Sequence, residues 1–154
     1  MMMRLICLIA TFGLWASLAA ADSPPEISMT FNHVALSVKD LERSATFYQD
    51  TFGLPEITNR TEIPGIRWFS LGEGKELHLI SVVADPVMTN KAVHFALTTP
   101  TFDAFLANLR ASGVEFSDFG GTPGKVSIRA DDTRQVYLQD PDGYWIEVNS
   151  VAAD

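Results

Sequence analysis

Cysteine is almost absent from this chain of 154 residues. The single one, Cys7, lies in an apolar N-terminal stretch, so a chain that loses this stretch has none. Without cysteine the protein has no disulfide, no thiolate zinc site and no thiol nucleophile. The chain must therefore fold on its hydrophobic core alone.

Positive charge is also scarce. Lys and Arg number 11 against 19 Asp and Glu, which gives a formal net charge of −8, and the basic residues form no cluster. This balance argues against nucleic acid and against anionic membrane surfaces as partners. We therefore expect a small-molecule substrate or ligand.

Long apolar runs are confined to the N-terminus. A positive start at Met1 to Arg4, an apolar run from Leu5 to Leu18 and the small residues 19–21 describe a secretory signal peptide, cleaved after Ala21. An uncleaved membrane anchor is the alternative. No other run approaches membrane-spanning length. We predict a secreted or periplasmic protein, with residues 1–21 as signal and 22–154 as a single domain that has no membrane contact after cleavage.

The rest of the chain contains an internal repeat. The segment His33-Val-Ala-Leu-Ser37 corresponds to His94-Phe-Ala-Leu-Thr98, and each is followed by an amphipathic pattern that predicts a helix. Asp40 is the expected N-cap of the first helix, over residues 41–52, and Gly53 its stop. The second helix is expected between Thr101 and Gly113.

Period-two patterns that follow each helix predict strands. They cover residues 56–61, 66–71 and 76–82 in the first copy, and 114–116, 126–129, 135–139 and 144–149 in the second. Two tandem βαβββ modules result, over about residues 30–83 and 91–150. Each module buries one face of its sheet under its helix, so we predict an α+β fold in which the modules form a paired mixed sheet that encloses a cleft.

Four side chains of the kinds that bind metals occupy equivalent positions on the predicted strands. They lie on strands, at the parity opposite to their apolar neighbours, and at equivalent places in the two copies: His33, His78, His94 and Glu147. Imidazole and carboxylate are the groups by which zinc, nickel, iron and manganese are bound. We predict one metal site with two ligands from each module. As isolated residues, all four would be hydrogen-bonded core or surface groups.

Further residues are weaker candidates for substrate binding. Arg67 would meet an anionic group or form a surface ion pair. Phe69 and Trp145 would line a pocket or fill core, and Asn149 shares the face of Glu147.

Three segments carry a resemblance to a known family: Asn32-His-Val-Ala-Leu-Ser-Val-Lys-Asp-Leu41, Val93-His-Phe-Ala-Leu97 and Tyr137-Leu-Gln-Asp-Pro-Asp-Gly-Tyr-Trp-Ile-Glu-Val-Asn149. Through them the chain resembles the vicinal oxygen chelate superfamily, which includes glyoxalase I, extradiol dioxygenases and bleomycin resistance proteins. The resemblance implies the tandem fold, the four ligands and a divalent metal that chelates adjacent substrate oxygens. Where glyoxalase I usually has a glutamate, this chain has His78.

Three functions follow from this resemblance. The first is a glyoxalase I-like lyase or isomerase, the lactoylglutathione lyase type, which would use zinc or nickel with Glu147 as ligand and general base. The second is an extradiol-type dioxygenase that would use iron or manganese. The third is a non-catalytic protein that binds a small molecule or a metal. Whether the modules pair within a chain or between two chains stays open, and a homodimer is preferred.

Overall fold

The computed structural model describes residues 28–83 and 85–151. The predicted signal peptide lies outside the described residues. In the part of the chain that is described, no helix combines the length and apolar character needed to cross a membrane.

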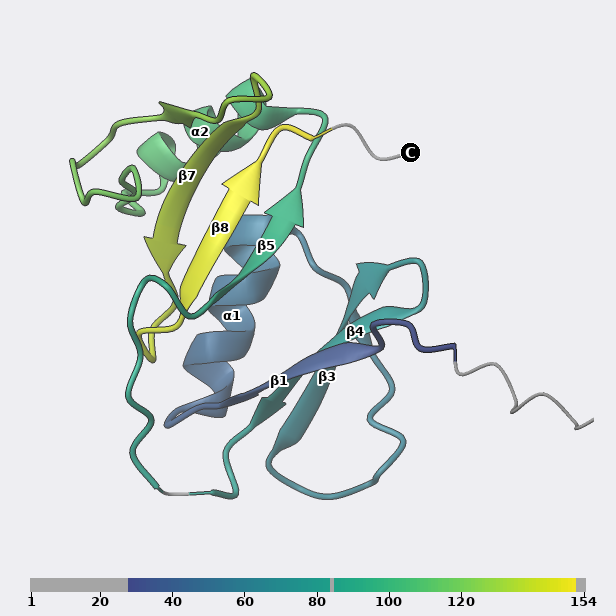
Figure 1. Ribbon diagram of the computed structural model, residues 1–154. Helices are drawn as coiled ribbons and strands as arrows, with labels where there is room; N and C mark the ends of the chain where they lie inside the picture. The colour runs from purple at the N-terminus through teal and green to yellow at the C-terminus, as the bar shows by residue number, and fades with distance from the viewer. Residues whose placement is uncertain (1–27, 84, 152–154) are drawn as a thin grey trace, which may run out of the picture. The chain divides into compact units, whose positions relative to one another are not determined.

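The first module contains one helix and a four-stranded sheet. Its elements in chain order are β1 (His33–Ser37), α1 (Leu41–Phe52), β2 (Glu56–Ile57), β3 (Ile66–Gly72) and β4 (Lys75–Ile80). The strand order is β1-β4-β3-β2, in which β1 runs parallel to β4 and the other neighbours are antiparallel (Figure 1).

The second module repeats this plan. Its elements are β5 (His94–Thr98), α2 (Phe102–Ala111), β6 (Ser127–Ile128), β7 (Arg134–Gln139) and β8 (Trp145–Asn149). The strand order is β5-β8-β7-β6, again with the first strand parallel to the last. The predicted α+β fold of two tandem βαβββ modules is confirmed.

Local chemistry sets the ends of α1 where the sequence predicts them. The Asp40 side chain accepts a hydrogen bond from the backbone N–H of Arg43 at 3.0 Å, which satisfies one free donor of the first turn. Gly53 ends the helix with φ of 67°, a left-handed conformation that glycine adopts without steric cost. Thr101 precedes α2, but its side chain makes no capping hydrogen bond.

Two predicted strands differ from the structure. The strand expected at residues 56–61 ends at Ile57, because the Asn59 amide donates to the carbonyls of Ile63 and Ile66 and turns the chain away from the ladder. The segment 114–116 is not a strand. The chain joins the sheet one residue later, where Ser117 forms an isolated bridge with Tyr137.

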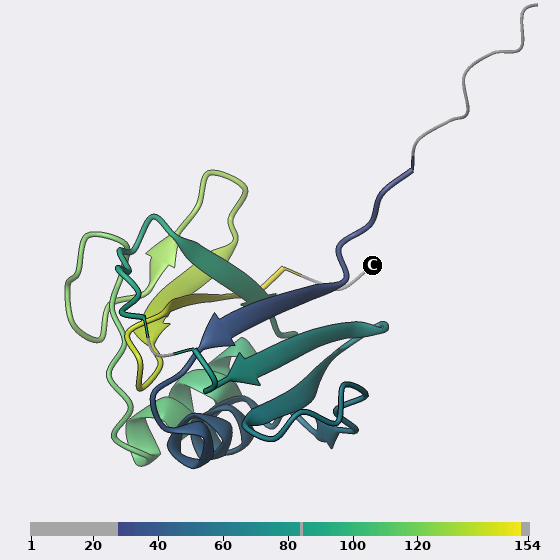
Figure 2. The same ribbon diagram turned by 90° about the horizontal axis from the view of Figure 1, so that it is seen from below.

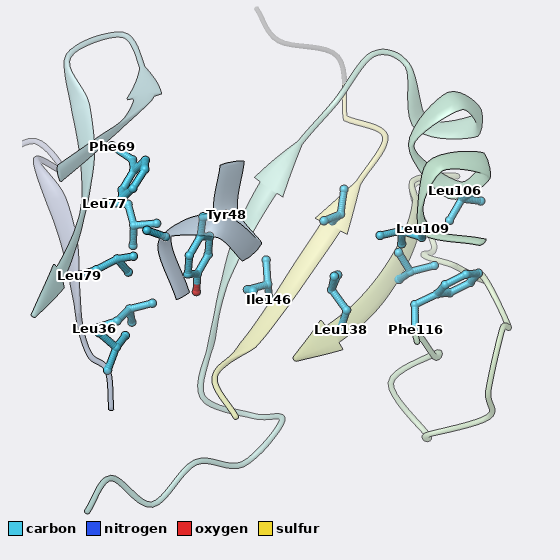
Figure 3. Close-up of a cluster of buried hydrophobic side chains, with 14 of the residues drawn as sticks. Leu36, Tyr48, Phe69, Leu77, Leu79, Leu106, Leu109, Phe116, Leu138 and Ile146 are labelled. Atoms are coloured by element: carbon cyan, nitrogen blue, oxygen red, sulfur yellow. The ribbon is translucent and has the colours of Figure 1, made fainter. Parts of the chain in front are cut away.

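The helix-covered faces of both sheets contribute to one hydrophobic cluster. Leu36, Leu77 and Leu79 from the first sheet and Leu138 and Ile146 from the second all belong to it, and Figure 3 shows them around Tyr48 of α1 and beside α2. The helices meet where α1 ends and α2 begins, through stacked rings of Phe52 and Phe105 whose centroids are 5.9 Å apart; both helices are seen at the bottom of Figure 2. The opposite faces, which carry the predicted ligands, are therefore turned away from the shared core.

A buried polar contact also joins the modules. The Tyr48 hydroxyl donates to the Asp140 carboxylate at 2.8 Å, and the other oxygen of that carboxylate accepts from the backbone of Asp142 and Tyr144. Burial raises the pKa of both the Tyr48 hydroxyl and the Asp140 carboxyl. The hydrogen bond therefore compensates groups that are costly to bury.

Replacement of Tyr48 by phenylalanine should lower the free energy of unfolding by about 1–3 kcal/mol, because the Asp140 oxygen then loses its buried donor. Urea denaturation of the two proteins measures this loss. Tyr144→Phe is the matched control, since that hydroxyl is only half-buried and bonds the backbone of Ser37. Equal losses in the two variants would contradict the importance given to burial.

Candidate metal centre

His78 lies at the centre of the candidate face of the first sheet. Its ring is stacked between Trp68 of β3, with centroids 4.0 Å apart, and His33 of β1, with centroids 4.4 Å apart. The interplanar angles are 6° and 14°. Trp68 and His78 are buried, whereas His33 is exposed. The first module therefore presents three nearly parallel rings.

Glu76 holds the His78 ring in this stack. Glu76 and His78 have the same parity on β4, and His78 Nε2 donates to the Glu76 carboxylate at 2.8 Å. Arg60 donates to the other carboxylate oxygen at 2.6 Å and lies over the Trp68 ring. The hydrogen bonds from His78 and Arg60 lower the pKa of the Glu76 carboxyl. Glu76 is thus an ionised carboxylate on the candidate face.

Glu147 has the position in the second sheet that His78 has in the first. Its carboxylate is buried and hydrogen-bonded. The Tyr137 hydroxyl donates to Oε2 at 2.5 Å, and the Asn149 amide donates to Oε1 at 2.9 Å. His94 Nε2 lies 3.5 Å from the same Oε2. Burial, followed by the hydrogen bond to Glu147, raises the pKa of the Tyr137 hydroxyl, so this group keeps its proton at neutral pH.

Two of the three histidines are oriented as metal ligands usually are. His33 Nδ1 donates to the Asn32 side-chain oxygen at 2.7 Å, and His94 Nδ1 donates to the Lys91 carbonyl at 2.9 Å. In both rings Nε2 is left with its lone pair available. A second hydrogen bond that fixes the tautomer of a ligating histidine is typical of metal sites.

His78 does not share this orientation, because Nε2 is the nitrogen that donates to Glu76. The lone pair of an imidazole lies in the ring plane, and the planes of His33 and His78 are stacked. Their lone pairs therefore do not converge on one point. His33, His94 and Glu147 carry donor groups of the kinds that a divalent metal binds, whereas the Nε2 atom of His78 is engaged with Glu76 in this arrangement. The site of four ligands stays a prediction.

The structure brings the predicted ligands together in pairs. His33 and His78 meet on the first sheet, and His94 and Glu147 meet on the second. Among residues 28–83 and 85–151, no group of three or more His, Cys, Asp or Glu side chains is placed to hold a metal ion. Each sheet thus carries half of the predicted site.

Two weaker candidates lie on the wrong face. Phe69 is fully buried in the core, and Arg67, at the same parity of β3, forms ion pairs with Glu42 of α1 and Glu56 of β2 at 2.8 and 2.6 Å. Both point to the helix-covered side of the sheet, so the structure removes them from the candidate site. Trp145 and Asn149 do lie on the candidate face, beside Glu147.

Several residues of this face were missed in the sequence. Tyr137 pairs directly with Glu147 across β7 and β8, and Glu76 lies two residues before His78. Strand parity gave a signal for both, because Tyr137 lies between Val136 and Leu138 and Glu76 shares the parity of His78. Lys91 was missed because it lies outside the strands.

Comparison with known sequences identifies the family of the chain. Residues 30–148 match the sequence model of the Glyoxalase/Bleomycin resistance protein/Dioxygenase superfamily. The match covers most of the chain, and the chain belongs to this superfamily.

Individual relatives are distant. A lactoylglutathione lyase of Arabidopsis thaliana is 28% identical over 135 residues, which are 81% of this chain but 45% of the relative, so the chain spans about half of that protein's length. Among solved structures, the oxidase ChaP-H1 is 24% identical with a TM-score of 0.67, covering 81% of this chain and 98% of its own. A lactoylglutathione lyase from Agrobacterium tumefaciens is 23% identical with a TM-score of 0.61, covering 81% and 96%. These structures show the fold.

Proposed function

We propose that the chain is a metal-dependent lyase or isomerase of the glyoxalase I type, which transfers a proton between adjacent carbons of a small substrate. The observation that carries this proposal is the orientation of His33 and His94, whose Nδ1 atoms are held by oxygens so that Nε2 is available, with Glu147 beside His94. Zinc or nickel suits this set of ligands. The relative named lactoylglutathione lyase supports the same class of reaction.

A second copy of the chain is needed to complete this site. The ligand pairs lie on two sheets whose candidate faces are turned away from one shared core. In a twofold dimer, the first sheet of each copy would face the second sheet of the other, and two equivalent sites would form. We therefore propose a homodimer in which His33 comes from one chain and His94 and Glu147 from its partner.

The chain's own residues would control the proton. A bound divalent ion would supply polarisation of two adjacent substrate oxygens. Glu147 would take the proton from the carbon next to them, since its carboxylate lies on the candidate face. Tyr137 and Asn149 fix both carboxylate oxygens, and this limits the motion of the base.

An extradiol-type dioxygenase is the second candidate, and one observation favours it. Because His78 is held by Glu76, the ligands that remain are two histidines and one carboxylate. This is the set used by non-haem iron oxygenases, which need open positions on the metal. Iron or manganese in the purified protein would support this candidate over the first.

Metal analysis tests the proposal. We also propose that the signal at residues 1–21 directs export, so the protein to analyse is the secreted or periplasmic form that begins at Asp22. We expect about one zinc or nickel ion per chain, and turnover of the adduct of methylglyoxal with a thiol that ceases in chelator. A chain free of tightly bound metal, with unchanged thermal stability in chelator, would contradict both enzymatic functions. Retention of residues 1–21 would contradict export.

A further inference from the structure

A pocket of about 340 Å³ opens beside the candidate face of the second sheet. Tyr137 and Trp145 of this face line it, together with Phe116, Ser117, Pro123 and the side chain of Lys91. Its volume lies at the small end of the range for ligand pockets, and its lining combines aromatic side chains with polar ones, among them Lys91, Ser117 and Gln139. Tyr137 connects the pocket to Glu147, because this residue lines the pocket and its hydroxyl donates to that carboxylate.

The ammonium group of Lys91 is held in this pocket by neutral groups. It donates to the Ser117 hydroxyl at 3.1 Å and to the Asp118 carbonyl at 3.0 Å, and it lies 4.3 Å from the centroid of the Trp145 ring. No carboxylate of the described residues lies within 4.0 Å of it. The nearby Asp118 carboxylate is paired with Lys125 at 2.9 Å. Among the residues that the structure describes, Lys91 is therefore a positioned cation without an anionic partner.

We propose that the Lys91 pocket binds the carboxylate group of a small aryl acid. Lys91 would pair with the carboxylate, since a half-buried cation held in place forms a stronger ion pair than a mobile surface one. Phe116, Pro123 and Tyr137 would contact the ring. Glu115 also lines the pocket, but its side chain is exposed, and solvent and salt screen its charge.

Only the chemical fate of the bound acid rests on the proposed function. Tyr137 lines the pocket and bonds Glu147, so only this side chain would separate a ligand held by Lys91 from the proposed base. Binding to the pocket itself needs no metal. The two proposals can therefore fail independently.

Titration of chelator-treated protein with mandelate and with its neutral analogue mandelamide tests the pocket. Wild-type protein should bind mandelate about tenfold or more tightly than mandelamide, the effect of one charge-assisted contact. Lys91→Met should weaken mandelate binding by about the same factor and leave mandelamide binding unchanged. Lys91→Arg should retain most of the affinity for mandelate. Lys75→Met, which removes a lysine that is paired with Glu73 on the first sheet, is the control and should bind as wild type does.

Equal binding of mandelate to wild type and Lys91→Met would overturn the inference, as would equal affinities for mandelate and mandelamide or no binding of mandelate at all. Thermal unfolding shows whether Lys91→Met is folded, and Lys91→Arg provides the folded variant if it is not. Because the titration is done without metal, a failure of the proposed enzymatic function would leave its result unchanged. If the pocket does not bind mandelate, the result of the metal analysis is likewise unchanged.

Discussion

Glu147→Gln should lower the turnover of the methylglyoxal–thiol adduct by about 10³-fold, within the range that general-base catalysis contributes. The substitution preserves the shape of the side chain, and the glutamine oxygen still accepts from the Tyr137 hydroxyl. The hydrogen bond from Asn149 is lost, because an amide NH2 group replaces the oxygen that accepts it. The substitution also removes the negative charge and the ability to accept a proton from carbon. Most of the metal should stay bound through His33 and His94. Initial rates and the metal content of the same preparations measure the two effects separately.

The matched control for this variant is Glu76→Gln. Glu76 is the buried carboxylate on the candidate face of the first sheet, bonded to His78 and Arg60. If Glu147 is the base, the control should lose no more than about 10–100-fold in rate, the effect of a group that only orients its neighbour. The reverse order of losses would move the base to Glu76. Full activity in Glu147→Gln would reject proton transfer by either oxygen of Glu147.

The positions of the predicted ligands could be read from the sequence because strand parity is a local property. A strand turns alternate side chains to opposite faces, so Leu77 and Leu79 in the core place His78 on the other face wherever the strand lies. The same reasoning applies to Glu147 between Ile146 and Val148. Parity alone does not say which of two adjacent aromatic residues faces the ligands. Phe69 was chosen where Trp68 is the residue that stacks on His78.

The orientation of each ring could not be predicted, because it depends on partners that are distant in sequence or outside the strands. The Lys91 carbonyl fixes His94, and Trp68 with Glu76 fixes His78. Repeat symmetry treats His78 and Glu147 as equivalent, yet one is held by a carboxylate and the other is a carboxylate held by Tyr137 and Asn149. Which two sheets form one site depends on how the sheets pack. Two repeats of the same fold permit pairing within a chain or between chains.

A mixture of two inactive variants should regain activity if two chains share each site. His33→Ala damages the half on the first sheet, and Glu147→Gln damages the half on the second. In a dimer formed from one copy of each variant, one site receives both changes and the other receives neither. Random exchange of equal amounts makes half of the dimers mixed, so about a quarter of all sites should be intact.

The mixture should therefore reach about a quarter of wild-type turnover, where each variant alone has about 0.1% or less. The subunits must exchange for this to happen, so the two chains are produced together in one cell and compared with a mixture of separately folded proteins.

A chain that carries both His33→Ala and Glu147→Gln, produced together with wild type, is the control. In a mixed dimer, one site pairs the first sheet of wild type with the damaged second sheet of the variant, and the other pairs the damaged first sheet of the variant with the second sheet of wild type. Mixed dimers should therefore have no intact site. Only the quarter of dimers that are purely wild type should be active. If the mixture of the two single variants is no more active than either variant alone, both halves of the site belong to one chain. The two candidate faces, which are turned away from the shared core, would then have to change their packing before a metal could bind.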